Sequence, residues 1–174
     1  MKKLLATALA TTSIISFATA EQSFNISIDG YDVLTSVYSV QVEWMKSEDF
    51  SILAKPYFLN KSESGIDWSG YGLELAGRMY KGGIGNSENP YGIFLQYGID
   101  FGYMKAEVGS YSDDTIYLGF NTKAGYRWIF SKHFTVDAGI GIGYYTSLIK
   151  YGTDDYRDFD GIELFGIISA GYSF

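Results

Sequence analysis

The side chains that most often perform catalysis are scarce in this chain. The 174 residues include a single histidine, His133, and no cysteine. A serine nucleophile needs a histidine within hydrogen-bonding reach as its general base. His133 stands beside Ser131 and Lys132 between two apolar stretches, which is typical of a solvated turn residue. The lack of cysteine excludes thiol catalysis, disulfide bonds and cysteine metal sites. The sequence therefore predicts no enzyme active site, no cofactor and no metal centre.

An acidic segment near the C-terminus is a second candidate for chemistry. Four carboxylates lie within the seven residues from Asp154 to Asp160, and carboxylate oxygens are ligands that Ca²⁺ accepts. The segment lacks the central glycine and the final glutamate of an EF-hand loop. A solvated acidic loop is the preferred interpretation, and cation binding is the alternative.

Nine ionisable residues elsewhere share one place in a repeating pattern. They fall on the polar side of stretches in which apolar and polar residues alternate, and none falls on the apolar side. They are Glu43, Lys55, Glu74, Arg78, Asp100, Lys123, Arg127, Asp137 and Glu163. Such a set could form a selectivity ring in a pore, or its members could pair between neighbouring strands and fill the interior. We favour pairing, because a small barrel encloses little beyond side chains.

The elements that must position these residues are β-strands, because successive side chains of a strand point to opposite faces. Between Tyr91 and Met104, every second residue is apolar and the others are mixed. Seven further stretches alternate in the same way. We therefore predict strands over residues 23–29, 36–44, 50–59, 71–80, 91–104, 115–129, 134–146 and 161–174.

The mixed faces of these strands distinguish a membrane barrel from a soluble sandwich. A face that meets water should carry many lysines and glutamates, but these faces carry few charges beside glycines and large aromatic residues. Glycines leave room for bulky neighbours inside a small barrel. The aromatic residues are Phe94, Tyr117, Tyr145 and Phe165. We expect an all-β fold, an eight-stranded antiparallel up-and-down transmembrane β-barrel with its apolar faces in lipid, and a soluble sandwich is the alternative.

The first twenty residues form a separate segment. Lys2 and Lys3 precede an apolar run, and Ala18-Thr19-Ala20 supplies the small residues that a signal peptidase reads. A membrane anchor is the alternative, but threonines and a serine keep the run below the roughly 20 apolar residues that a span needs. We expect a signal peptide over residues 1–20, cleaved near Ala20, and a barrel domain over residues 21–174.

The connections between the predicted strands indicate how the barrel is oriented. In such barrels, short periplasmic turns alternate with longer outer loops. Residues 45–49 and 131–133 fit short inner turns, 81–90 is long for one, and the polar segments 60–69, 105–114 and 147–160 are predicted outer loops. Aromatic residues near the strand ends indicate two interfacial girdles. The inner one contains Trp44, Trp128, Phe134 and Tyr172, and the outer one contains Trp68, Tyr71, Tyr103 and Tyr144.

The last strand ends in an alternating apolar pattern of Ile168, Ala170, Tyr172 and Phe174. Together with the signal peptide and the eight strands, this pattern resembles the small Gram-negative outer-membrane β-barrels, including OmpA-type and OmpX-type domains of the porin-like superfamily. Segments 124–130 and 134–144 resemble their penultimate hairpin. The resemblance implies contact with outer-membrane lipid and lipopolysaccharide. It also implies an assembly signal, at Tyr172 and Phe174, for the barrel-assembly machinery.

These expectations favour a structural or surface-interaction role, with an extracellular ligand contacting loops 60–69, 105–114 and 147–160. A narrow channel for small solutes is the alternative. A lipid A-modifying enzyme is less favoured, because the one histidine is predicted on the periplasmic side. The formal charge of −7 argues against a nucleic-acid partner.

Overall fold

The chain folds into a closed antiparallel barrel, which confirms the predicted fold class. A computed structural model describes residues 24–81, 91–109, 111–151 and 160–174. Each strand pairs with its neighbours in the sequence, and β8 closes onto β1. Within these ranges the strands are β1 (Phe24–Asp29), β2 (Val37–Met45), β3 (Phe50–Glu63), β4 (Ile66–Lys81), β5 (Gly92–Val108), β6 (Tyr111–Phe130), β7 (Phe134–Tyr151) and β8 (Gly161–Ser173), and the one helix of the described residues is α2 (Gly30–Leu34).

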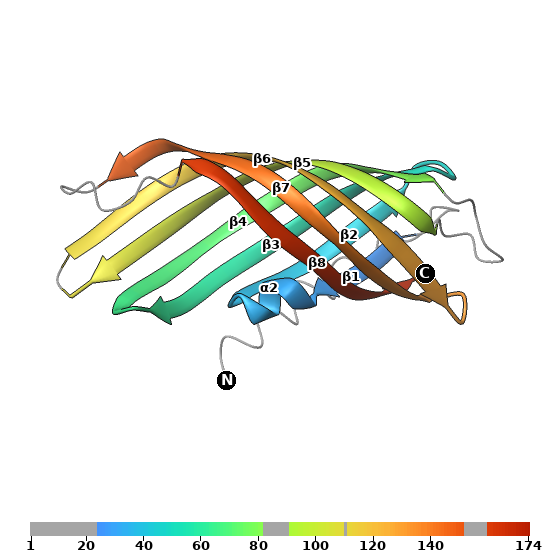
Figure 1. Ribbon diagram of the computed structural model, residues 1–174, viewed down its shortest axis with the longest axis horizontal. Coiled ribbons are helices and arrows are strands. Elements are labelled where there is room, and N and C mark those ends of the chain that lie inside the picture. The colour runs from blue at the N-terminus through green and yellow to red at the C-terminus, as the bar shows by residue number, and fades with distance from the viewer. Residues whose placement is uncertain (1–23, 82–90, 110, 152–159) are drawn as a thin grey trace.

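The two ends of the barrel differ, and we name them by what lies there. At the terminal end, the Phe174 amide donates to the Phe24 carbonyl, and the two rings stack 4.8 Å apart. The opposite end, here called the distal end, carries α2 and the tips of the β3–β4 and β5–β6 hairpins. Figure 1 shows these hairpins reaching well past α2, so the distal rim is uneven. No helix within the described ranges is long and apolar enough to cross a membrane.

The alternation of residues sets which side chains face out. Leu75, Ile99, Phe120 and Tyr144 are consecutive cross-strand partners from β4 to β7, and each side chain is about half exposed. The adjacent row alternates to the other face and contains Glu74 and Asp100, both buried. The outer surface is therefore apolar while the ionisable groups lie inside, as expected from a period of two.

Inward-facing glycines sit opposite the large aromatic residues of the interior. The pairs are Tyr57 with Gly72, Phe94 with Gly125, Tyr117 with Gly102, Tyr145 with Gly119 and Phe165 with Gly141. A Cβ at Gly125 would lie only 2.5 Å from both Phe94 Cζ and the Ala138 carbonyl oxygen. Each glycine thus provides the space that the ring on the next strand occupies.

The predicted outer loops 60–69 and 105–114 are wrong, because both segments are mostly strand. β3 and β4 continue to a turn at Ser64 and Gly65, which have φ values of 55° and 79°. β5 continues to Val108, next to Gly109 with a φ of 62°. β7 likewise runs to Tyr151, into the predicted loop 147–160. Backbone pairing needs no apolar side chains, so these strands extend beyond the apolar pattern that revealed them.

The helix α2 replaces strand pairing in one part of the wall. β1 ends at Asp29, opposite Ser169, whereas β8 extends further toward the distal end, to Gly161. The Asp29 carboxylate accepts from the Tyr31 amide at 3.0 Å and caps the helix. A Cβ at Gly166 would contact the Tyr31 ring, so α2 lies against β8 where β1 has stopped. No element was predicted between residues 29 and 36.

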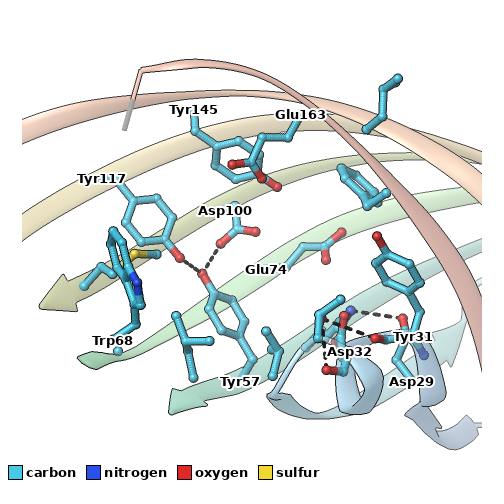
Figure 2. Close-up of a pocket in the computed structure, with 18 of the residues that line it drawn as sticks. Asp29, Tyr31, Asp32, Tyr57, Trp68, Glu74, Asp100, Tyr117, Tyr145 and Glu163 are labelled. Atoms are coloured by element: carbon cyan, nitrogen blue, oxygen red, sulfur yellow. Dashed lines mark hydrogen bonds and ion pairs between the residues drawn. The ribbon is translucent and has the colours of Figure 1, made fainter. Parts of the chain in front are cut away.

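One predicted girdle residue faces the other way. Trp68 shares its strand face with Glu74 and Arg78 and points into the barrel (Figure 2). Tyr71 and Tyr144 are exposed on the outside, as are Trp128, Phe134 and Tyr172 toward the terminal end. The prediction that Trp68 belongs to a lipid-facing girdle is therefore wrong. The alternation along β4 places its side chain on the inner face, with the polar residues of that strand.

Candidate functional site

The nine ionisable residues singled out in the sequence come together inside the barrel, with one exception. Eight of them are buried and Glu163 is exposed. Glu163 lies at the edge of an internal cavity near the distal end. The eight buried residues form an ionic cluster in the terminal half and an ion pair at the cavity floor, with Lys55 and Asp100 beside the cavity.

The cluster, here called the ionic layer, consists of Glu43, Arg78, Arg127 and Asp137, all at most 1% exposed. Arg127 binds Asp137 through two nitrogens, at 2.6 and 2.8 Å, and binds Glu43 at 2.7 Å. Arg78 Nη1 donates to Asp137 at 2.8 Å. Two guanidinium groups face two carboxylates, so the layer is charge-balanced.

Aromatic and polar neighbours hold the ionic layer in place. The Tyr80 hydroxyl and the Ser51 hydroxyl each donate to Glu43 at 2.5 Å. The Arg78 guanidinium lies 4.3 Å from the centre of the Phe94 ring, a cation–π geometry. All four charged groups of the layer thus have hydrogen-bond partners, as burial requires, and among their charged-group atoms only Arg127 Nη1 has none.

Most buried ion pairs join strands that are not neighbours in the sheet. Arg127 and Asp137 are direct partners on β6 and β7. Arg127 also reaches Glu43 on β2, and Lys123 on β6 reaches Glu74 on β4, with both Glu74 oxygens 2.7 Å from the Lys123 nitrogen. The expectation of pairing between neighbouring strands is therefore correct for only part of the network, because a narrow closed barrel also brings opposite walls within reach.

Gln96 connects the ionic layer to the cavity floor. Its side-chain oxygen accepts from Arg78 Nε and Nη2 at 2.9 and 2.7 Å, and its amide nitrogen donates to Glu74 at 2.9 Å. A continuous hydrogen-bonded chain therefore runs from Arg78 to Lys123. Polar side chains, together with the buried rings of Tyr80 and Phe94, occupy the interior up to this point.

On the distal side of these hydrogen-bonded side chains lies a cavity of about 620 Å³, here called the distal cavity. Glu74, Lys123 and Lys55 are among its lining residues, and side chains of all eight strands and of α2 surround it. Figure 2 shows Glu74 between Asp100 and the residues of α2. Lys55 binds Asp32 at 2.7 Å and Asp29 at 3.2 Å, which ties α2 and the end of β1 to β3. Both Lys55 and Lys123 are therefore already paired with carboxylates.

Four aromatic side chains and one carboxylate form the wall of the distal cavity opposite α2 (Figure 2). The Tyr57 hydroxyl donates to Asp100 Oδ1 at 2.5 Å and also contacts the Tyr117 hydroxyl. The Tyr117 and Tyr145 rings meet edge to face with centroids 6.1 Å apart. Trp68 completes this group, here called the aromatic wall.

His133 lies far from the distal cavity, in the turn before β7 at the terminal end. Its ring stacks on Tyr172 with centroids 5.3 Å apart, and its Nδ1 lies 3.0 Å from the Ser173 carbonyl oxygen. Tyr172 and Phe174 are both about half exposed. In the part of the chain that the structure describes, no group of three acidic or histidine side chains is placed to hold a metal ion. The acidic segment 154–160 lies outside the described residues except for Asp160.

Comparison with known proteins identifies the fold. No protein-family model and no curated protein matches the chain. The crystal structure of the N-terminal β-barrel domain of Pseudomonas aeruginosa OprF is similar, with 12% identity and a TM-score of 0.58, covering 88% of this chain and 96% of that one. The chain has the same fold as that barrel domain. Neisserial surface protein A (NspA) is similar at 14% identity and a TM-score of 0.47, covering 87% of this chain and 92% of that one.

Several interior residues that complete the network were not among the site residues predicted from the sequence. Gln96 and Tyr80 share a strand face with Phe94 and Arg78, so the strand phase alone could have identified them. Tyr57 could have been found in the same way from Lys55. Asp32 could not, because it lies in α2 and follows no strand pattern.

Proposed function

We propose that this protein is a non-conducting β-barrel of a Gram-negative outer membrane, with a structural role and a surface-interaction role at its distal end. The observation that carries the proposal is the ionic layer inside a barrel whose outer face is apolar. The apolar outer face supports residence in a membrane, and the ionic layer supports a bore that does not conduct.

The outer surface supports residence in a membrane. The row of Leu75, Ile99, Phe120 and Tyr144 is one of several apolar rows on the outside of the strands. In water such a continuous apolar surface would be an aggregation hazard. In a bilayer it matches the hydrocarbon, and the closed sheet leaves no unpaired edge in lipid.

The interior supports a closed bore. Arg78 and Arg127 extend from β4 and β6 to carboxylates on β2 and β7, and all four side chains are almost fully buried. Gln96 and the Lys123–Glu74 pair add further side chains above them. A water-filled selectivity ring would leave such groups exposed to the pore, so the solute-channel alternative is disfavoured.

The enzyme alternative is disfavoured by the place of His133. The residue lies at the terminal end and its ring is occupied by Tyr172 and the Ser173 carbonyl. Lipid A lies in the outer leaflet, which would surround the distal half in the proposed orientation. A lipid-editing mechanism that depends on this histidine would have to act on the wrong side.

The remaining parts of the proposal concern processing and partners. We infer cleavage of residues 1–20 near Ala20, and assembly through Tyr172 and Phe174 by the barrel-assembly machinery. Lipid and lipopolysaccharide would surround the outer face. An extracellular partner would meet the distal hairpin tips within 60–69 and 105–114 and the 147–160 connection. Residues 1–23 and 152–159 lie outside the described residues, so these inferences rest on the sequence.

Conductance in planar bilayers tests the closed bore. We expect the refolded protein to insert without discrete conductance steps, while a porin of open bore conducts under the same conditions. Replacing Glu43 and Arg127 together with alanine removes one charge of each sign from the ionic layer and should produce ion passage. Steady conductance by the unaltered protein, unchanged in the Glu43→Ala/Arg127→Ala variant, would show that the ionic layer does not close the bore.

A further inference from the structure

We propose that the distal cavity is a binding site for an organic cation of the alkylammonium class. This inference goes beyond the proposed structural role, since it assigns a ligand to a cavity that closing the bore does not require. The cavity's volume of about 620 Å³ falls within the range of roughly 300–1,000 Å³ that is common for small-molecule sites.

The charges around the cavity favour a cation. Six acidic side chains line it, against three lysines. Lys123 is bound by Glu74, and Lys55 is shared by Asp29 and Asp32. The third lysine, Lys61, pairs with Glu63. No lysine or arginine of the described ranges forms an ion pair with Asp100 or Glu163. The cavity therefore carries excess negative charge, unlike the balanced ionic layer.

Asp100 is a buried member of this group of acidic residues. Its side chain is only 8% exposed, and its Oδ1 accepts a hydrogen bond from Tyr57. A buried carboxylate without a cationic partner is costly, because burial removes the water that would solvate it. A bound cation would supply the missing partner.

The aromatic wall determines which kind of cation fits. Trp68, Tyr57, Tyr117 and Tyr145 surround the side of the cavity where Asp100 lies (Figure 2). The faces of such rings attract ammonium groups, most strongly when the groups carry methyl or alkyl substituents that shed water easily. A hard metal ion instead requires several convergent oxygens. Carboxylate and aromatic rings together therefore favour an alkylammonium over a metal ion or an anion.

The ammonium group could reach the cavity on a free amine or on a lipid headgroup. Ile162 and Leu164 of β8 also line the cavity, and both side chains are largely exposed on the outside. They lie in the part of β8 that extends beyond β1, beside α2. An amphiphile could thus place its headgroup inside and its chains against this outer surface, and the experiment below separates the two sources.

Choline is the probe, and 3,3-dimethylbutan-1-ol is its neutral isostere. The protein is refolded in a maltoside detergent, because phosphocholine detergents would themselves supply the ligand. Replacing Trp44 and Trp128 with phenylalanine leaves Trp68 as the only tryptophan, so its fluorescence reports on the cavity. We expect saturable binding of choline, with the isostere weaker by roughly tenfold or more. Equal binding of the two compounds would overturn the proposal.

Charge variants in the same background test the role of the carboxylates. Asp100→Asn keeps an oxygen that can accept from Tyr57 and should weaken choline binding by roughly tenfold. Glu163→Gln, at an exposed position, should weaken it less and is independent of any folding defect. Glu107→Gln is the matched control, because Glu107 pairs with Lys105 outside the cavity. Unchanged affinity in both Asp100→Asn and Glu163→Gln, in protein that retains folded gel mobility, would refute the site.

Lipid bilayers separate the two sources of the ammonium group. The affinity for choline is compared in vesicles of phosphatidylglycerol with and without phosphatidylcholine. Competition by phosphatidylcholine would assign the site to a lipid headgroup, and unchanged affinity would assign it to a free amine. Absence of choline binding in both vesicles and detergent would reject the cation site, while the conductance of the bore would remain a separate question.

Discussion

Replacing Arg127 with methionine would test whether the ionic layer stabilises the barrel. The arginine makes two hydrogen bonds to Asp137 and one to Glu43, and its side chain is fully buried. Charge-assisted hydrogen bonds contribute roughly 1.5–3 kcal/mol each, but Arg78 would remain to share both carboxylates. Removal of one partner from a buried ion pair typically costs about 3–5 kcal/mol, because a charge is left uncompensated. We expect Arg127→Met to lower the free energy of unfolding by that amount.

Urea unfolding of the protein in lipid vesicles, followed by tryptophan fluorescence and gel mobility, measures this loss. Lys61→Met is the matched control, because Lys61 pairs with Glu63 at an exposed position, and such pairs contribute about 0–1 kcal/mol. Adding Asp137→Asn to Arg127→Met should restore part of the stability by removing the uncompensated charge. A loss no larger than that of the control, or strictly additive losses in the double variant, would refute the reasoning.

Three further perturbations address the membrane, the packing and α2. Ile99→Lys places a charge in the middle of the outer apolar row and should cost about 2–4 kcal/mol in vesicle unfolding, whereas a water-exposed site would tolerate it within about 0.5 kcal/mol. Gly125→Ala should cost about 1–3 kcal/mol by overpacking, and Gly161→Ala, with nothing within 4 Å of its Cβ, should cost little in the same assay. Lys55→Met removes the tie to Asp29 and Asp32, and hydrogen exchange should then accelerate in residues 30–35 while the central strands stay protected.

The sequence predicted the strands and their inner faces because both follow from a strict period of two. Once a single charge such as Glu74 is assigned to the interior, Arg78, four residues later on the same strand, must face the same way. The same logic placed Asp100 and Lys123. Glycines opposite aromatic rings, such as Gly125 and Phe94, are a further consequence of a small closed bore.

The strand ends and the ion-pair partners could not be predicted in this way. Beyond the apolar belt, strands β3 to β6 continue with polar residues. The turn after β3 depends on positive φ values at Ser64 and Gly65, and β5 ends next to a positive φ at Gly109. The partner of Arg127 on β2 lies four strands away along the sheet, and only the closure of the sheet brings Glu43 within reach. The helix α2 has five residues, too few for a helical period to be recognised.

We assign closure of the bore to the ionic layer and ligand binding to the distal cavity, because only the ionic layer is charge-balanced. The ionic layer pairs two arginines with two carboxylates, while Asp100 and Glu163 have no ion pair with any residue in the described ranges. Changes at Arg127 should therefore alter stability and ion passage while choline affinity stays constant. Asp100→Asn should weaken choline binding and leave the bore closed. If both variants changed both properties together, the interior would be one coupled network, and the division between a closing layer and a binding cavity would have to be abandoned.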